Sequence, residues 1–196
     1  MSFLLGLTGS IGMGKSTTAQ MFRDEGIPVW DADAAVHKIY AKGGAAVPVF
    51  ADRYPEVVTN GAVSRPALRA LIAAKPDVLR EIEQIVHPFV ADDRKAFLAR
   101  HSDALLVFDI PLLFETKADL WLNAVAVVTA PLDVQRARVL DRPEMTQAQF
   151  NLIISKQMPD AEKRALADYV IETVSMDAAR LCVQHIIDKL KGQPIA

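Results

Sequence analysis

The segment Gly9-Ser-Ile-Gly-Met-Gly-Lys-Ser16 constrains the fold more than any other part of the chain, because it fits the phosphate-binding pattern G-x-x-x-x-G-K-[S/T]. An apolar run over residues 3–7 precedes it and predicts a buried strand, and residues 18–24 predict a helix behind it. Glycines let the backbone curl so that successive N–H groups point at an anion, and the start of a helix adds its positive dipole end. This order of strand, glycine loop and helix predicts a binding site for a nucleoside triphosphate.

Two side chains of the loop carry predicted chemistry of their own. Lys15 supplies a mobile positive charge for the outer phosphates, and the Ser16 hydroxyl has the right size for a Mg²⁺ ligand. The other contacts are expected from backbone N–H groups. The residues predicted to hold ATP are Ser10, Ile11, Gly12, Met13, Gly14, Lys15, Ser16 and Thr17.

The composition is typical of one globular domain. The 196 residues are 51% hydrophobic and 23% charged, and the formal net charge of −2 predicts no basic surface for nucleic acid. The single cysteine, Cys182, excludes an internal disulfide and lies in an apolar helical stretch, where it is expected to be a small core residue. No charged leader precedes the first strand and no apolar run approaches membrane-spanning length, so we expect a cytoplasmic protein without membrane contacts.

Short apolar runs and helical patterns alternate in most of the chain. The helical pattern over residues 176–190 has Leu181 among its expected buried residues. The alternation predicts an α/β fold with a five-stranded parallel sheet covered by helices on both faces, in three layers. The runs that predict strands cover residues 3–7, 27–30, 104–108, 124–128 and 169–171, and further helices are expected over residues 131–139 and 146–158.

Residues 34–103 have a different pattern. Ser64-Arg-Pro66 has the form of a helix cap with a proline in the first turn, and Lys75-Pro76 interrupts the helical signal that follows. No strand is predicted between residues 34 and 103. We interpret this segment as a helical insertion into a core formed by residues 1–33 and 104–196.

Acidic residues follow two of the predicted strands, at the edge where an open parallel sheet binds its ligands. Asp31 and Asp33 come after the second strand, and Asp109 and Glu115 come after the third. Phosphoryl transfer needs a metal near the phosphates and a group that orients or deprotonates the acceptor hydroxyl, roles that Asp31 and Asp33 could fill. Alternatively, either aspartate could cap the next helix, and Asp109 could be a metal-binding acid or a loop residue before Pro111.

Arg138 and Arg142 are spaced i, i+4 near the end of a predicted helix, so we expect both on one face. There they could neutralise charge on the transferred phosphoryl group, and a solvated helix end is the alternative. Arg136 is expected off that face, in solvent. His87, before Pro88, is a lone histidine, which is usually structural.

Two classes of nucleotide-binding protein are excluded because their motifs are absent from the sequence. A regulatory GTPase needs a D-x-x-G switch and an N-K-x-D guanine reader, and neither occurs in the sequence. A Rossmann dinucleotide-binding protein needs the spacing G-x-G-x-x-G, which the loop does not match. What remains is a small-molecule kinase whose insertion covers an acceptor and whose late arginines belong to a short lid, predicted at residues 138–158.

Six motifs follow one another along the chain: Gly6-Leu-Thr-Gly-Ser-Ile-Gly-Met-Gly-Lys-Ser-Thr17, Asp31-Ala-Asp33, His87-Pro88, Pro111-Leu-Leu-Phe-Glu115, Gln157-Met-Pro159 and Ala167-Asp-Tyr-Val-Ile171. Together they resemble the dephospho-coenzyme A kinases, over nearly the whole chain. The resemblance implies the fold of nucleoside-monophosphate kinases, in which residues 34–103 form a helical coenzyme A subdomain. It also implies ATP-dependent phosphorylation of the ribose 3′-hydroxyl of dephospho-coenzyme A, the last step of coenzyme A synthesis.

The resemblance assigns roles residue by residue. It implies that Asp33 is the acceptor base, that Lys15 acts on the phosphates, and that Arg138 and Arg142 lie on the lid side of ATP. The implied substrate-binding residues are Thr8, Asp33, His87, Pro88 and Leu112, and the expected metal ligands are Ser16, Asp31 and Asp109.

The chain departs from the pattern of these kinases at several positions. Ser10 and Met13 replace a more common glycine and serine, but both side chains can point away from a backbone cradle. Pro143, Ile153 and the pair Glu172-Thr173 replace residues expected near the lid and the adenine. A kinase for another small acceptor, such as a nucleoside monophosphate, and an ATP-binding switch without catalysis are the alternative functions.

Overall fold

The computed structural model describes residues 2–143 and 145–191, in two compact units. The first unit combines residues 1–30 with 101–196, and the second comprises residues 31–100. Residue 144, inside the predicted lid, and residues 1 and 192–196, at the ends of the predicted core, lie outside the described part. Within the described residues, no helix is both long and apolar enough to span a membrane.

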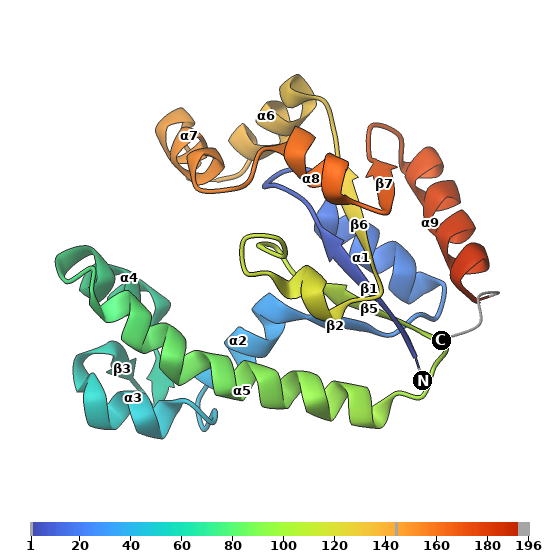
Figure 1. Ribbon diagram of the computed structural model, residues 1–196. Coiled ribbons are helices and arrows are strands. Elements are labelled where there is room, and N and C mark those ends of the chain that lie inside the picture. The colour runs from blue at the N-terminus through green and yellow to red at the C-terminus, as the bar shows by residue number, and fades with distance from the viewer. Residues whose placement is uncertain (1, 144, 192–196) are drawn as a thin grey trace. The chain divides into compact units, whose positions relative to one another are not determined.

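Five strands form one sheet in the described part of the chain, in the order β2-β5-β1-β6-β7 (Figure 1). The central strand β1 pairs in parallel with β5 and β6, and β6 pairs in parallel with β7. β5 and β6 are buried along their whole length, which explains their continuous apolar sequences. The predicted parallel sheet is confirmed. Its strands are β1 (Phe3–Thr8), β2 (Val29–Asp31), β5 (Leu105–Asp109), β6 (Ala124–Thr129) and β7 (Tyr169–Glu172).

Helices α1 (Lys15–Asp24) and α9 (Met176–Lys191) cover one face of this sheet (Figure 1). Phe22 of α1 and Ile186 of α9 share a core cluster with inward-facing residues of β1, β5, β6 and β7. The other face is reached by α8 (Asp160–Leu166), which packs against β6. The unit also contains η2 (Ala118–Trp121), α6 (Leu132–Leu140) and α7 (Gln147–Ser155).

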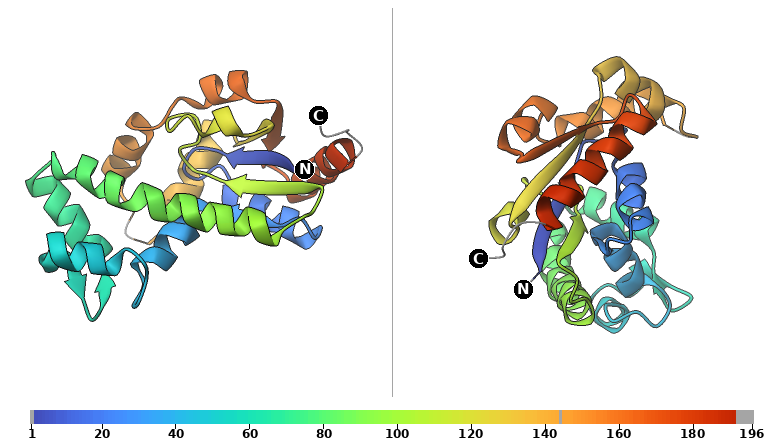
Figure 2. Two further views of the ribbon diagram at one scale, coloured as in Figure 1. Left: turned by 60° about the horizontal axis from the view of Figure 1, so that its bottom comes forward. Right: turned by 90° about the vertical axis from the view of Figure 1, so that its right-hand side faces the viewer.

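The second unit has a helical core of its own. Phe50 and Val57 are fully buried at its centre, and Tyr40 packs edge-on against the Phe50 ring, with ring centroids 5.6 Å apart. The expected cap at Ser64 is present, since its hydroxyl accepts a hydrogen bond from the Ala67 N–H. The helices are α2 (Ala32–Tyr40), α3 (Val47–Arg53), η1 (Pro55–Val57), α4 (Arg65–Ala74) and α5 (Val78–Arg100), the last continuous through Pro88 (Figure 2).

The prediction of no strand in this segment is wrong. A two-stranded antiparallel hairpin joins β3 (Val58–Thr59) to β4 (Ala62–Val63). Its turn is Asn60-Gly61, and both residues have positive φ, +53° and +77°, as a two-residue hairpin turn requires. The Asn-Gly pair is a recognised hairpin signal, but strands of two residues are too short to show alternation.

Three smaller expectations also need correction. Helix α8 lies in a segment where no helix was predicted. The helix expected over residues 146–158 ends at Ser155. Leu181 is 66% exposed rather than buried, because it lies on the outer side of α9.

Candidate active site

The phosphate loop links β1 to α1, and its backbone has the shape that the motif predicts. Gly12 and Gly14 have φ values of +77° and +91°, in the left-handed region that favours glycine. A Cβ atom on Gly12 would clash with a methyl carbon of Val139, so α6 packs directly on this turn. Gly14 caps α1 without a side-chain hydrogen bond. The first N–H groups of α1 have no partner within the helix, so they are available to an anion.

Two glutamines from other segments form hydrogen bonds with the backbone of Ile11 in the loop. The Gln135 amide donates to the Ile11 carbonyl at 2.7 Å, and the Ile11 N–H donates to Gln157 Oε1 at 3.1 Å. The Met13 N–H donates to the Ser10 carbonyl at 3.2 Å. Ile11 and Met13, both predicted to bind phosphates, therefore use their N–H groups within the protein in this structure. The N–H groups at the start of α1 are the better candidates for ATP.

Lys15 forms an ion pair with Asp109. Lys15 lies in the first turn of α1, and Asp109 is the last residue of β5 and only 3% exposed. The predicted meeting of the loop with the end of this strand is confirmed. Ser16, in the same turn as Lys15, is exposed. Its hydroxyl and the Asp109 carboxylate are hard oxygen donors suited to Mg²⁺, whose other ligands are usually waters and phosphate oxygens.

The loop after β5 is tied to the end of β1. The hydroxyl of Thr8 donates to the Pro111 carbonyl at 3.0 Å, and the Ile110 N–H donates to the Leu7 carbonyl at 3.0 Å. Thr8 is completely buried, so it fixes this loop instead of offering a surface to a substrate. Leu112, which the resemblance placed at the substrate, is 40% exposed.

A buried ion pair anchors the segment that carries Gln157. Lys163 of α8 has no exposed surface, and its ammonium lies 2.9 Å from Glu115 Oε1. The same carboxylate oxygen accepts a hydrogen bond from the Met158 N–H at 2.8 Å. Burial alone would raise the pKa of Glu115, but the Lys163 ammonium and the Met158 N–H lower it below its ordinary value. Glu115 is therefore a carboxylate that ties α8 to the end of β5.

Arg138 and Arg142 do not share a helix face. Arg138 lies in α6, and its guanidinium donates to the hydroxyl and carbonyl oxygens of Thr173 at 3.0 and 2.6 Å. Helix α6 ends at Leu140, so Arg142 lies beyond its cap and the helical spacing no longer applies. Arg142 and Arg136 are both exposed, as was expected of Arg136.

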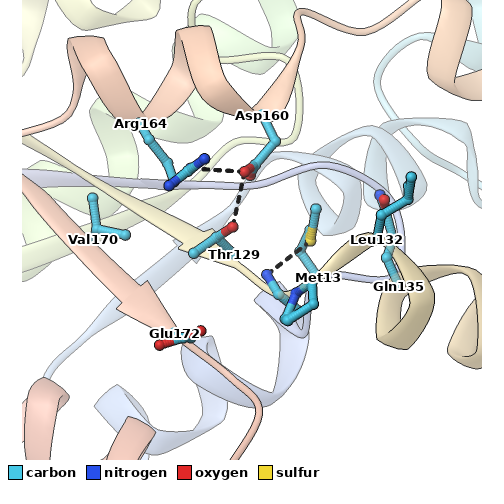
Figure 3. Close-up of a pocket in the computed structure, with 10 residues that line it drawn as sticks. Met13, Thr129, Leu132, Gln135, Asp160, Arg164, Val170 and Glu172 are labelled. Atoms are coloured by element: carbon cyan, nitrogen blue, oxygen red, sulfur yellow. Dashed lines mark hydrogen bonds and ion pairs between the residues drawn. The ribbon is translucent and has the colours of Figure 1, made fainter.

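A pocket of about 480 Å³ borders the phosphate loop (Figure 3). Met13 forms one wall, and its sulfur accepts a hydrogen bond from the Ala130 N–H at 3.0 Å. Asp160 of α8 accepts hydrogen bonds from the Thr129 hydroxyl and from Arg164, both at 2.9 Å. The lining residues are Met13, Thr129, Ala130, Pro131, Leu132, Gln135, Asp160, Arg164, Val170 and Glu172. Sequence reasoning missed this pocket, because its walls come from segments far apart in the chain.

The other predicted acceptor residues, Asp33, His87 and Pro88, lie in the second unit, as does Asp31. Asp31 accepts a hydrogen bond from the Ala34 N–H at 2.9 Å, which confirms the alternative that it caps α2. Asp33 is exposed in the first turn of α2. His87 is exposed on α5, and Pro88 borders a pocket of about 350 Å³ lined by Val49, Arg53, Gln84, Ile85, Pro88 and Phe89. The position of Asp33 relative to the phosphate loop stays a prediction.

Comparison with known proteins supports the resemblance seen in the motifs. A curated protein of Ruegeria pomeroyi named dephospho-CoA kinase is 54% identical over 192 residues, 98% of each chain. A dephospho-CoA kinase of a Jannaschia species is 56% identical, with 97% of this chain and 98% of that one aligned. A crystal structure from Thermus thermophilus has a TM-score of 0.88 at 31% identity, covering 97% of this chain and 99% of that one. The model of the dephospho-CoA kinase family matches residues 3–177, so the chain belongs to this family.

Proposed function

We propose that the protein transfers the γ-phosphoryl group of ATP to the ribose 3′-hydroxyl of dephospho-coenzyme A, which gives coenzyme A and ADP. The observation that carries this proposal is the phosphate loop with Lys15 paired to Asp109, in a chain that matches the family over most of its length. A phosphate that enters the loop competes with Asp109 for the Lys15 ammonium. Lys15 then turns to the outer phosphates, and the Asp109 carboxylate is released.

The donor side of the reaction depends on groups at the start of α1. The N–H groups of Lys15, Ser16 and Thr17 lie at the positive end of the helix, where they are suited to the β- and γ-phosphates. Mg²⁺, when bound, would be held by the Ser16 hydroxyl and Asp109, and would neutralise charge on the phosphates. Arg138, together with Arg142 from the predicted lid, would stabilise the transferred phosphoryl group.

The acceptor side depends on the second unit. Asp33 is an exposed carboxylate in the first turn of α2, able to accept the proton of the ribose hydroxyl. The pocket beside Pro88 has apolar walls from Val49, Ile85 and Phe89, and Arg53 and Gln84 add polar groups to its lining. Such a lining suits the pantetheine arm, which alternates short alkyl segments with amides. Transfer is direct and in line, without a phosphoenzyme.

One coupled assay tests the proposal. Release of ADP from ATP is measured with dephospho-coenzyme A and, in separate assays, with AMP, CMP and shikimate as alternative acceptors. We expect turnover with dephospho-coenzyme A and background rates with the other three. Stimulation by AMP alone would replace our proposal with a nucleoside-monophosphate kinase. ATP binding without any acceptor-dependent turnover would indicate a non-catalytic switch.

A further inference from the structure

The hydroxyl of Thr173 joins the phosphate loop to Arg138. Thr173 follows β7 and is only 7% exposed. Its hydroxyl donates to the Met13 carbonyl at 2.8 Å and accepts a hydrogen bond from Arg138 Nη1 at 3.0 Å. A second guanidinium nitrogen of Arg138 donates to the Thr173 carbonyl at 2.6 Å. One buried residue therefore holds the loop backbone and the predicted ATP-binding arginine at the same time.

The position of Thr173 is set by the sheet. Its N–H donates to the Thr129 carbonyl at 2.9 Å, one residue beyond the pairing of Thr129 with Glu172. The Thr129 carbonyl also lies 3.3 Å from the Thr173 hydroxyl. On its other side, Thr173 fills the space next to Gly14, where a Cβ atom would lie 3.1 Å from its Oγ1. The strands thus fix Thr173, and the turn of the phosphate loop packs on it.

We propose that Thr173 is a positioning residue for ATP binding, which acts by holding Arg138 against the phosphate loop before the nucleotide arrives. A free arginine side chain loses rotamer freedom when it is ordered on a ligand, and this cost is reduced when the side chain is already held. The two hydrogen bonds to Thr173 fix the plane of the guanidinium. A guanidinium has five N–H donors, so the remaining ones are left for a phosphate group or the adenine of ATP. The inference rests on the proposed function, because it takes Arg138 as an ATP contact.

The hydroxyl is the group to remove, since valine has nearly the same shape. In Thr173→Val the Met13 carbonyl loses its donor in a buried position, and Arg138 keeps only its bond to the Thr173 carbonyl. Thr173→Ser restores the hydroxyl without the methyl group. Thr59→Val makes the same change on an exposed threonine of β3 and serves as the control.

The test measures the affinity for AMP-PNP with Mg²⁺ by isothermal titration calorimetry, together with thermal unfolding of each variant. We expect Thr173→Val to weaken binding about tenfold, Thr173→Ser to stay within about threefold of the wild type, and Thr59→Val to bind normally. In an Arg138→Ala background, Thr173→Val should weaken AMP-PNP binding by less than a further factor of about three, because both changes remove the same contact. If Thr173→Val does not fold, Thr173→Ala provides a second variant without the hydroxyl.

Three results would overturn the inference: normal affinity in both hydroxyl-free variants, no recovery with serine, or an undiminished loss in the Arg138→Ala background. A purely structural role would lower the melting temperature and leave the affinity of the folded protein unchanged. Because AMP-PNP binding involves no acceptor, failure of this inference is distinguishable from failure of the proposed function. Turnover of dephospho-coenzyme A by wild type with unchanged AMP-PNP affinity in the variants would reject only the role of Thr173.

Discussion

The phosphate loop and the predicted acceptor residues are held in different ways. Side chains from other elements brace the loop: Gln135 and Gln157 hold Ile11, and Thr173 holds Met13. In contrast, Asp33 and His87 are exposed on the surface of α2 and α5. A rigid donor site can keep the triphosphate in line for transfer, whereas an exposed acceptor site can admit and release a large substrate.

Among the substitutions that distinguish the donor region from the acceptor region, Asp33→Asn is expected to have the largest effect on activity. Loss of the acceptor base should lower kcat at least about a hundredfold while the KM for ATP stays nearly the same. Steady-state assays with varied ATP and dephospho-coenzyme A measure both constants. The control is Asp52→Asn, which changes an exposed aspartate of α3 in the same unit. Near-normal turnover of Asp33→Asn would remove Asp33 from the catalytic role.

Glu115→Gln tests the bracing behind the donor site. The change leaves the fully buried Lys163 ammonium without its carboxylate, so we expect the free energy of unfolding to fall by about 2 kcal/mol at pH 7. Urea unfolding measures this loss, and Glu162→Gln on the exposed side of α8 is the matched control.

The pH dependence gives a second check on Glu115. Because its pKa is lowered in the folded protein, its stabilising contribution is complete above the pKa of an unfolded glutamate and is lost as pH falls through the lower folded pKa. The difference between wild type and Glu115→Gln should therefore shrink in acid. A difference that grows as pH falls would contradict the ion pair.

Phe89→Ala tests the pocket of the second unit. Removal of the aromatic wall should raise the KM for dephospho-coenzyme A about tenfold, because apolar burial of the substrate arm is lost. The KM for ATP should not change. Phe3→Ala makes the same substitution at the start of β1, in the other unit, and controls for general loss of packing. An equal rise in both KM values would argue against a substrate pocket.

Gln157→Leu has the smallest expected effect. The Ile11 N–H loses its acceptor, so the loop becomes less ordered and the KM for ATP should rise about fivefold, with little change in the KM for dephospho-coenzyme A. Gln184→Leu repeats the substitution on the surface of α9. The bracing of the loop would be unimportant for ATP if both variants had the same KM.

The two regions also differ in how well the sequence predicts them. The loop, its flanking elements and the pairing with the end of β5 follow from contiguous motifs and apolar runs, so they could be predicted. The bracing could not, because Gln135 and Lys163 look like ordinary surface residues of helices until distant segments bury them. Arg142 was predicted to share a helix face with Arg138, but the helix ends before Arg142. Helix ends are the least certain part of a sequence pattern. The arrangement of Asp33 and the loop depends on two units, which no local spacing encodes.

The product of the reaction tests the central claim most directly. Purified protein is incubated with ATP, Mg²⁺ and dephospho-coenzyme A, and the product is analysed by mass spectrometry and phosphorus NMR. We predict one added phosphoryl group on the ribose 3′-oxygen, equivalent to authentic coenzyme A, with one ADP formed per product. Phosphorylation at another position, or ADP formation with unmodified dephospho-coenzyme A, would contradict the account.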